Sequence, residues 1–422
     1  MAAETIAQTA FRKIIWRLMP LLTVSYILNY LDRGNIGFAA LQMNHQLGLS
    51  AAQFGVGAGI LSLGYCTFEI PSNLALYRFG ARKWIARIMI TWGFVAAGCA
   101  LIQGPASFYS IRFLLGVTEA GFFPGIAFLL SQWFPAEYRA RMLAILLLGV
   151  PVSSVVGGPV SGALLGLDQI GGLAGWQWMF IIEGLPTIVL GFVVLWALAD
   201  SPATASWLTP EEKTAVQAQI AAEPRHKPVS HLWTALKDPR VLILALIQFG
   251  FTTGSYGVGI WLPQIIKTHF HDNLTVGFVS AGPYIIASIA MLVWAGIVDR
   301  SGKRIGNLIL TCGLATVGLV LSVVFAEFWL SFFWLTVALV GITAARAVFW
   351  TVPARFLTGV AAAGGLAFIN SIGTIGGFVG PAAVGWLKSA TGSFSAGLIG
   401  MAGFLLLSAV LAVALRLFVP RE

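Results

Sequence analysis

Charged residues are scarce in this sequence. Asp, Glu, Lys and Arg make up only 10% of the 422 residues, against roughly 25% in a soluble domain. Hydrophobic residues make up 58%, more than a water-soluble core of this length needs, so a soluble globular protein is excluded. Cysteine is rare too: the three cysteines lie apart in apolar runs, which predicts small packing residues and no disulfide framework.

Motifs for enzyme chemistry are missing as well. The sequence has no phosphate-binding Gly-x4-Gly-Lys-Ser/Thr loop, no glycine fingerprint for a dinucleotide and no His-Glu-x-x-His metal site. No nucleophile–base pair is evident. We therefore expect no cofactor, no metal and no enzymatic activity. The first ten residues also lack the basic region of a removable signal peptide.

Long apolar runs are what the sequence has instead. Runs of about 20 residues can cross a bilayer as helices, and we count twelve. They predict an all-α polytopic membrane protein with twelve transmembrane helices, at about 15–41, 53–77, 84–103, 107–133, 142–166, 176–199, 240–264, 275–298, 305–326, 328–353, 361–387 and 395–418.

The net charge is +9, and the basic residues behind it are distributed according to this division into spans and loops. Of the 25 Lys and Arg, only Arg33, Arg112 and Arg346 lie deep within spans, and only Lys267 and Lys388 lie in loops after odd-numbered spans. The others lie at the termini, or in the loops after even-numbered spans and at their edges. By the positive-inside rule these loops and both termini are cytoplasmic. The basic excess is therefore a topology signal, and no nucleic-acid partner is expected.

A polar loop divides the spans six and six. It predicts an N-terminal six-helix bundle over 1–199, a cytoplasmic linker over 200–239 and a C-terminal six-helix bundle over 240–422. Within the linker, "TPEEKTAVQAQIAAEP" predicts a short helix with Thr209 as its N-cap and Glu212 completing a capping box. We interpret it as a surface helix of the linker.

The two halves resemble each other. "YRFGARK" follows span two and "DRSGKR" follows span eight, so Arg78 and Arg300 are 222 residues apart. Gly-Pro breaks in spans five and eleven place Pro159 and Pro381 at the same separation of 222. Two unrelated landmarks with one offset indicate duplication of a six-helix unit. Many secondary transporters are built in this way, with a substrate site between the halves.

These features resemble the major facilitator superfamily. More narrowly, "YLDRGNIGFA", "RFLLGVTEAGFFPG", "WMFIIEGLP" and "INSIGTIGGFVGP" are similar to the anion:cation symporter family, which imports organic acids. The resemblance covers nearly the whole chain. It departs at Tyr77, where the family usually has Asp. It also implies a gate, in which Asp299, Arg300 and Arg304 after span eight and Arg78 after span two form a cytoplasmic latch.

Ionisable residues inside the spans cost about 2.5–3.5 kcal/mol each to insert, so each is a functional hypothesis. The alternative is that they only neutralise one another, and for Glu69 and Glu183 we favour such a structural role. Arg112 and Glu119 are seven residues apart and so share one face of span four, about 10.5 Å apart along its axis. The full set is Asp32, Arg33, Glu69, Arg112, Glu119, Glu183 and Arg346.

The superfamily fold lines its cavity with spans one, four, seven and ten. The resemblance therefore places Asp32 and Arg33 opposite Arg112 and Glu119. Arginine stays protonated and offers a planar donor fork to a carboxylate, which predicts Arg33 and Arg112 as substrate-anion contacts. Carboxyl groups can change charge with their surroundings. Asp32 and Glu119 are the predicted proton-coupling groups, because protonation would remove their repulsion of an anion.

Polar residues of the second half provide a basis for recognising hydroxyl groups. Asn370 matches a family position associated with substrate contact. Gln248 and Tyr256 lie on one face of span seven, where hydrogen bonds between helices are the alternative role. Arg346 lies about 13 Å from the expected cytoplasmic edge. It is either a further anion contact, favouring a dicarboxylate, or a side chain that extends toward the cytoplasm.

We therefore expect a proton-coupled importer of small organic anions, a symporter in the inner (plasma) membrane that works by alternating access. A hydroxylated dicarboxylate or sugar acid such as tartrate is the favoured substrate. Aromatic carboxylates resembling phthalate or hydroxyphenylacetate are the alternative, with a slot of Phe122, Phe123, Phe249 and Trp350. The repeat of a six-helix unit argues against a sensor that binds an organic acid without moving it. The predicted cavity arginines, Arg33 and Arg112, argue against an exporter of cations. The resemblance implies a monomer.

Overall fold

The computed structural model describes residues 2–222, 238–353 and 359–419, and these are helical apart from turns and short loops. The prediction of twelve transmembrane helices is confirmed, since twelve segments are long and apolar enough to cross a membrane. Several of these spans consist of two consecutive helices.

The N-terminal half contains spans one to six. Spans one, four and five are each divided in two, and spans three and five end in single 3₁₀ turns, η1 (Cys99–Leu101) and η2 (Leu165–Leu167). The helices are α1 (Ala2–Gly34), α2 (Ile36–Gln46), α3 (Ala51–Phe79), α4 (Ala81–Gly98), α5 (Pro105–Glu119), α6 (Phe122–Trp133), α7 (Ala136–Leu147), α8 (Gly149–Leu164) and α9 (Gly175–Ala197).

The described part of the linker contains the α-helix α10 (Pro210–Ala221), and each span of the C-terminal half is a single helix over its described residues. These are α12 (Pro239–Lys267), α13 (Asn273–Ser301), α14 (Arg304–Val324), α15 (Phe328–Phe349), α16 (Gly359–Thr391) and α17 (Phe394–Leu415).

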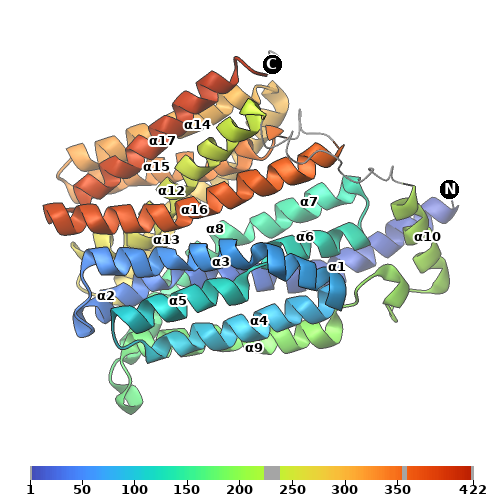
Figure 1. Cartoon of the computed structure of the whole chain (residues 1–422), viewed down its shortest axis with the longest axis horizontal. Coiled ribbons are helices and arrows are strands. Elements are labelled where there is room, and N and C mark those ends of the chain that lie inside the picture. The colour runs from blue at the N-terminus through green and yellow to red at the C-terminus, as the bar shows by residue number, and fades with distance from the viewer. Residues whose placement is uncertain (1, 223–237, 354–358, 420–422) are drawn as a thin grey trace.

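The two halves lie side by side with their helices running along the long axis of the molecule (Figure 1). The start of α1 lies at the right of the view, and α17 runs from the left of the view up and to the right; we call the end of the bundle toward which the start of α1 and the end of α17 lie the terminal end. The turns between α2 and α3 and between α16 and α17 lie at the opposite end, which we call the far end. This arrangement follows from an even number of spans in each half.

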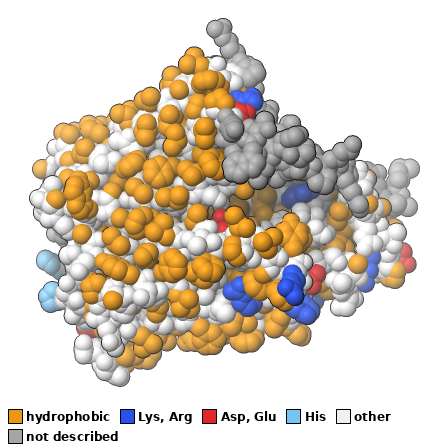
Figure 2. Space-filling view, in the orientation of Figure 1, with side chains coloured by type: hydrophobic (Ala, Val, Ile, Leu, Met, Phe, Trp, Pro, Cys, Tyr) orange, Lys and Arg blue, Asp and Glu red, His pale blue; other side chains and the backbone are white. Residues whose placement is uncertain are grey.

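The outside of the bundle is apolar. Large hydrophobic side chains cover the face seen in Figure 2, and Lys and Arg gather toward the terminal end. Trp196, for example, is 86% exposed and Trp16 is 73% exposed. Such side chains are costly to expose to water but suit a lipid environment.

The halves approach each other closely toward the far end. A side chain at Gly158 of α8 would meet the backbone oxygen of Gly277 of α13, and one at Gly59 of α3 would meet the backbone of Phe378 of α16. Close to the start of α3, the Ala52 amide donates to Ser389 Oγ of α16 over 2.9 Å. Small residues at these positions let helices pack backbone to backbone.

Span four is interrupted directly after Glu119. Gly121, which links α5 to α6, has a φ of 84°, a left-handed conformation that glycine adopts at little cost. The Ser72 hydroxyl of α3 donates to the Ala120 carbonyl over 2.6 Å. It thereby satisfies one of the carbonyl groups that a helix end leaves unpaired.

The described part of the linker packs on the N-terminal half. Thr209 Oγ1 accepts a hydrogen bond from the Glu212 amide and caps α10, as the sequence predicts. Glu212 in turn forms an ion pair with Lys13 of α1. Trp207 stacks on Trp133 of α6, with ring centroids 5.5 Å apart.

Candidate functional site

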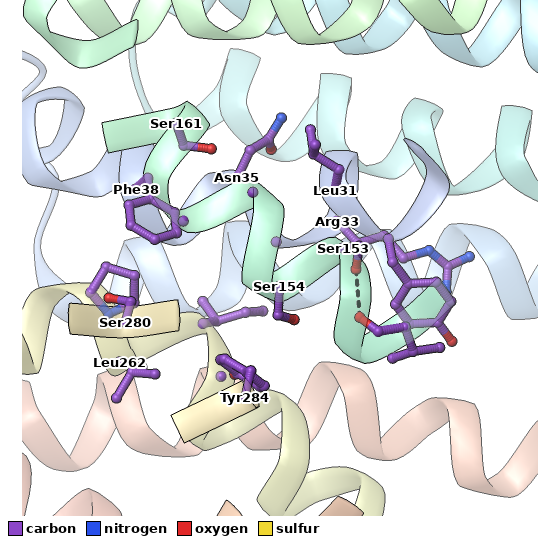
Figure 3. Close-up of a pocket in the computed structure, with 18 of the residues that line it drawn as sticks. Leu31, Arg33, Asn35, Phe38, Ser153, Ser154, Ser161, Leu262, Ser280 and Tyr284 are labelled. Atoms are coloured by element: carbon purple, nitrogen blue, oxygen red, sulfur yellow. Dashed lines mark hydrogen bonds between the residues drawn. The ribbon is translucent and has the colours of Figure 1, made fainter. Parts of the chain in front are cut away.

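A cavity of about 120 Å³ lies between the two halves. Its walls come from α1, α2 and α8 of the N-terminal half and from α12, α13 and α15 of the C-terminal half (Figure 3). Hydroxyl groups and two arginines dominate its polar lining: Tyr30, Arg33, Asn35, Ser153, Ser154, Ser161, Ser255, Tyr256, Ser280, Tyr284 and Arg346.

Arg33 of α1 lines the cavity and also holds Glu119 of α5. Its Nε lies 2.7 Å from Glu119 Oε2, and Asn29 Nδ2 donates to the same oxygen over 3.1 Å. The rings of Tyr30 and Tyr65 lie 5.5 and 4.9 Å from the guanidinium carbon, within the range of cation–π attraction. A substrate anion that bound Arg33 would therefore compete with Glu119 for the guanidinium.

Arg346 of α15 lines the same cavity from the opposite half. Its Nη2 donates to Ser255 Oγ of α12 over 3.0 Å, and Tyr256 and Tyr284 are close enough to interact with its charge. Among the residues that the structure describes, no carboxylate forms an ion pair with Arg346. None of the described lining residues is acidic, so Arg346 places a positive charge at the cavity wall that none of these residues neutralises.

Asp32 is turned away from this cavity into the interior of the N-terminal half. It is 1% exposed, and its Oδ2 accepts from Trp92 Nε1 of α4 over 2.7 Å and from Thr187 Oγ1 of α9 over 3.3 Å. Its other oxygen, Oδ1, has no hydrogen-bond partner among the described residues. The structure therefore separates the two adjacent charges: Arg33 lines the cavity, and Asp32 lies behind its wall.

Three further predicted substrate contacts are not among the described lining residues. Arg112 of α5 is 1% exposed, and its Nη2 donates to the Ala58 carbonyl over 3.5 Å. Gln248 of α12 packs against α16. Asn370 of α16 donates to Glu69 Oε1 of α3 over 3.4 Å, which links the two halves. Tyr256 does line the cavity, as Arg33 and Arg346 do, so three of the six predicted substrate contacts are among the described lining residues.

The predicted gate residues lie at helix ends. Asp299, Arg300 and Arg78 are exposed, and Arg304 Nη1 donates to the Thr351 carbonyl over 3.1 Å, just beyond α15. Arg78 lies over the ring of its neighbour Phe79. Within the described part of the chain none of the four forms an ion pair, so no latch between charged groups is formed there in this conformation.

The aromatic residues of the alternative substrate slot pack elsewhere. Phe122 contacts Trp92 edge to face, Phe123 lies against Tyr26, Phe249 against Phe404 and Trp350 against Phe349. None of these four is among the described lining residues of the cavity. The geometry therefore does not favour an aromatic slot.

Sequence reasoning missed most of the polar wall. The serines of α8 and Ser255, Ser280 and Tyr284 of the second half line the cavity. Ser153 donates back to the Val150 carbonyl over 2.6 Å, the bond drawn in Figure 3. Serine and tyrosine are common in transmembrane helices and carry no spacing signal. No cluster of three or more metal-ligating side chains lies within the described ranges.

Two bundles of six membrane helices with a polar cavity between them define a secondary transporter. The chain belongs to the Major Facilitator Superfamily, whose family model matches residues 22–264 and 244–422.

Known proteins similar to this chain include transporters of different stated substrates. A protein of Agrobacterium vitis named "Putative tartrate transporter" is 48% identical, over 97% of this chain and 92% of its own length. The "Quinolone resistance transporter" of Acinetobacter baumannii is 42% identical, over 92% and 90% of the two chains. A solved structure of a bacterial homologue of the human lysosomal transporter Spinster, inward-facing and occupied, has a TM-score of 0.78 at 17% identity, covering 94% of this chain and 96% of its own. That likeness concerns the fold.

Proposed function

We propose that this protein is a proton-coupled importer of a hydroxylated dicarboxylate or sugar acid, with tartrate as the first candidate. The observation that carries the proposal is Arg346, a cavity arginine with no carboxylate partner among the described residues. With Arg33 across the cavity, it offers the two carboxylates of one small molecule a separate guanidinium each. The serine and tyrosine hydroxyls around them suit substrate hydroxyls. The relative named for tartrate transport supports the same substrate class.

Coupling to protons follows from the pair of Arg33 and Glu119. While Glu119 is ionised it occupies one edge of the guanidinium and repels a second anion. Protonation of Glu119 weakens that bond and frees Arg33 for the substrate. Proton and anion therefore bind in cooperation, and Asp32 behind the wall is the second predicted coupling group.

Alternating access then moves the bound pair across the membrane. By the positive-inside rule the basic residues support a cytoplasmic terminal end, and the close approach of the halves lies toward the far end. We take this conformation to be the one open to the cytoplasm. In the opposite conformation the terminal ends of the halves would meet, and Asp299, Arg300, Arg304 and Arg78 would form the latch.

The test uses purified protein in liposomes that contain a pH-sensitive dye. Tartrate, a sugar acid, phthalate and a quinolone are added outside in separate experiments, with wild type and Glu119→Gln compared. We expect internal acidification with tartrate or the sugar acid in the wild type and none in the variant. Entry of labelled tartrate without protons would contradict the coupling, and proton-linked movement of the quinolone alone would contradict the substrate class.

A further inference from the structure

A second buried carboxyl lies directly behind the cavity wall. Glu183 of α9 is 4% exposed. Its Oε1 accepts from Ser161 Oγ of α8 over 2.7 Å, and its Oε2 accepts from Asn35 Nδ2 over 2.9 Å. Both donors line the cavity, and Figure 3 shows them side by side on one wall. Ser161 and Asn35 therefore each connect Glu183 to the cavity through a single hydrogen bond.

No cationic group of the described residues pairs with Glu183 in its ionised form. Among the described ion pairs none includes it, and both of its donors are neutral groups. A buried charge without an opposite charge is costly, and the usual relief is to take up a proton. A carboxyl that served only to tie helices together would not need to be ionisable, since an amide could accept and donate at the same places.

The neighbours can accommodate either protonation state. Asn35 is buried, and its Oδ1 has no hydrogen-bond partner among the described residues. If its amide turns over, that oxygen can accept a hydrogen bond from a neutral Glu183. The Ser161 hydroxyl can donate to an ionised carboxylate and accept from a neutral carboxylic acid. A carboxyl that is protonated for part of the transport cycle needs an acceptor beside it, and the unpartnered Asn35 Oδ1 can supply one.

Asp32 is the charged group that faces Glu183 from the neighbouring helices. Thr187, one turn along α9 from Glu183, donates to Asp32, and the two carboxyls interact electrostatically. From α4, Gly93 and Ala97 approach Gly184, the residue after Glu183, and from η1 the thiol of Cys99 lies near Asp32. Glu119 and Arg112 of α5 interact with Asp32. Repulsion between Asp32 and Glu183 favours a state in which one of them is protonated.

We propose that Glu183 is the group through which the cavity exchanges protons with the buried acids of the N-terminal half, and that Ser161 relays the proton. A hydronium ion in the cavity gives a proton to Ser161 Oγ and becomes water, while the hydroxyl proton of Ser161 passes to Glu183 Oε1, and the reverse transfer returns the proton to water. No other bond is made or broken. Asn35 donates without relaying, because an amide does not release its proton. This inference rests on the proposed proton-coupled transport and assigns it an additional proton-exchange site.

The test compares three variants with wild type in liposomes. Glu183→Gln removes the proton but keeps an acceptor for Ser161 and a donor for Asn35. Ser161→Ala removes the relay but keeps the carboxyl. Glu137→Gln neutralises an exposed acid of α7 and is the matched control. Substrate exchange is measured with labelled tartrate on both sides, and accumulation is measured under an imposed pH gradient.

For Glu183→Gln we expect exchange to continue, its pH dependence to flatten and accumulation to fall. Each coupled proton contributes about tenfold accumulation per unit of imposed pH gradient, so the loss of one removes that factor. Ser161→Ala is expected to slow proton uptake relative to exchange, and Glu137→Gln to match wild type.

If Glu183 is purely structural the prediction differs, because glutamine still accepts from Ser161 and donates to Asn35 Oδ1 once that amide turns over. Unchanged accumulation and an unchanged pH profile in Glu183→Gln, in a wild type that is proton-coupled, would overturn this inference alone. If wild-type protein accumulates no substrate under a pH gradient, the proposed function itself is wrong. If Glu183→Gln loses exchange as well, folding is checked by thermal unfolding in detergent, and a folded variant without exchange would also contradict the inference.

Discussion

The two halves of the cavity handle charge in different ways. On the N-terminal side Arg33 is paired with Glu119, and two more carboxyls, Asp32 and Glu183, lie buried behind the wall. On the C-terminal side the Arg346 guanidinium donates to the Ser255 hydroxyl, and none of the described residues of the cavity wall is acidic. Under the proposed function the two halves would therefore divide the work: the buried carboxyls of one half would hold protons, and Arg346 of the other would present positive charge to an anion.

This asymmetry makes Arg33 the residue whose loss should be most damaging. In Arg33→Gln the substrate loses a charge-assisted contact, and Glu119 is left buried without its cation. Removing the cation from a buried, hydrogen-bonded pair between a protein group and its ligand costs about 2–5 kcal/mol of binding free energy. We expect tartrate affinity to fall by at least about 30-fold, because about 1.4 kcal/mol corresponds to a factor of ten. Equilibrium binding of labelled tartrate to protein in detergent measures this.

The double variant Arg33→Gln with Glu119→Gln sharpens the result. It removes the unpaired carboxylate while keeping the loss of the guanidinium. Partial recovery of folding stability without recovery of binding would separate the two effects. Full binding in the single variant would show that Arg33 is only an ion-pair partner, and the difference between the halves would lose its functional meaning.

Arg346→Gln should have a smaller and more selective effect. No carboxylate of the described chain is left unpaired, so the loss is confined to one contact with the substrate. A hydrogen bond to a charged group contributes about 1.5–3 kcal/mol, which predicts a loss of about 10- to 100-fold for a dicarboxylate. A hydroxy acid with a single carboxylate should be affected little. Competition of both acids against labelled tartrate gives the comparison, and equal losses for both would contradict a second carboxylate site.

The sequence predicts the membrane architecture well because hydrophobic length is a local property. Each span needs only about 20 apolar residues to be recognised, and the basic loops order the spans. The capping box at Thr209 is equally local, and the structure has the helix where the sequence places it. The interruption after Glu119 is different, since the left-handed Gly121 depends on contact with Ser72 of another span.

The site could be predicted only in part. Arginine in a membrane span is a rare and costly choice, so Arg33 and Arg346 could be singled out from sequence, and both line the cavity. The direction of a side chain around its helix is set by tertiary packing. Sequence therefore could not tell that Asp32 points toward Trp92 while its neighbour Arg33 faces the cavity. For the same reason the hydrogen bond from Ser161 to Glu183 could not be predicted from the sequence.

The smallest expected effect lies outside the cavity, where the linker packs on the N-terminal half. Lys13 beside Glu212 lowers the pKa of that carboxyl, so the pair stabilises the fold above the ordinary Glu pKa and loses this contribution as pH falls through the lowered value. Lys13 is 48% exposed, which limits the contribution to about 1 kcal/mol or less. Glu212→Gln, which keeps an acceptor for the Thr209 amide, should lower thermal stability slightly at pH 7, match wild type at a pH below both values and leave tartrate transport unchanged. Impaired transport in this variant would mean that the docking of the linker takes part in alternating access, and the division of labour between the halves would have to include it.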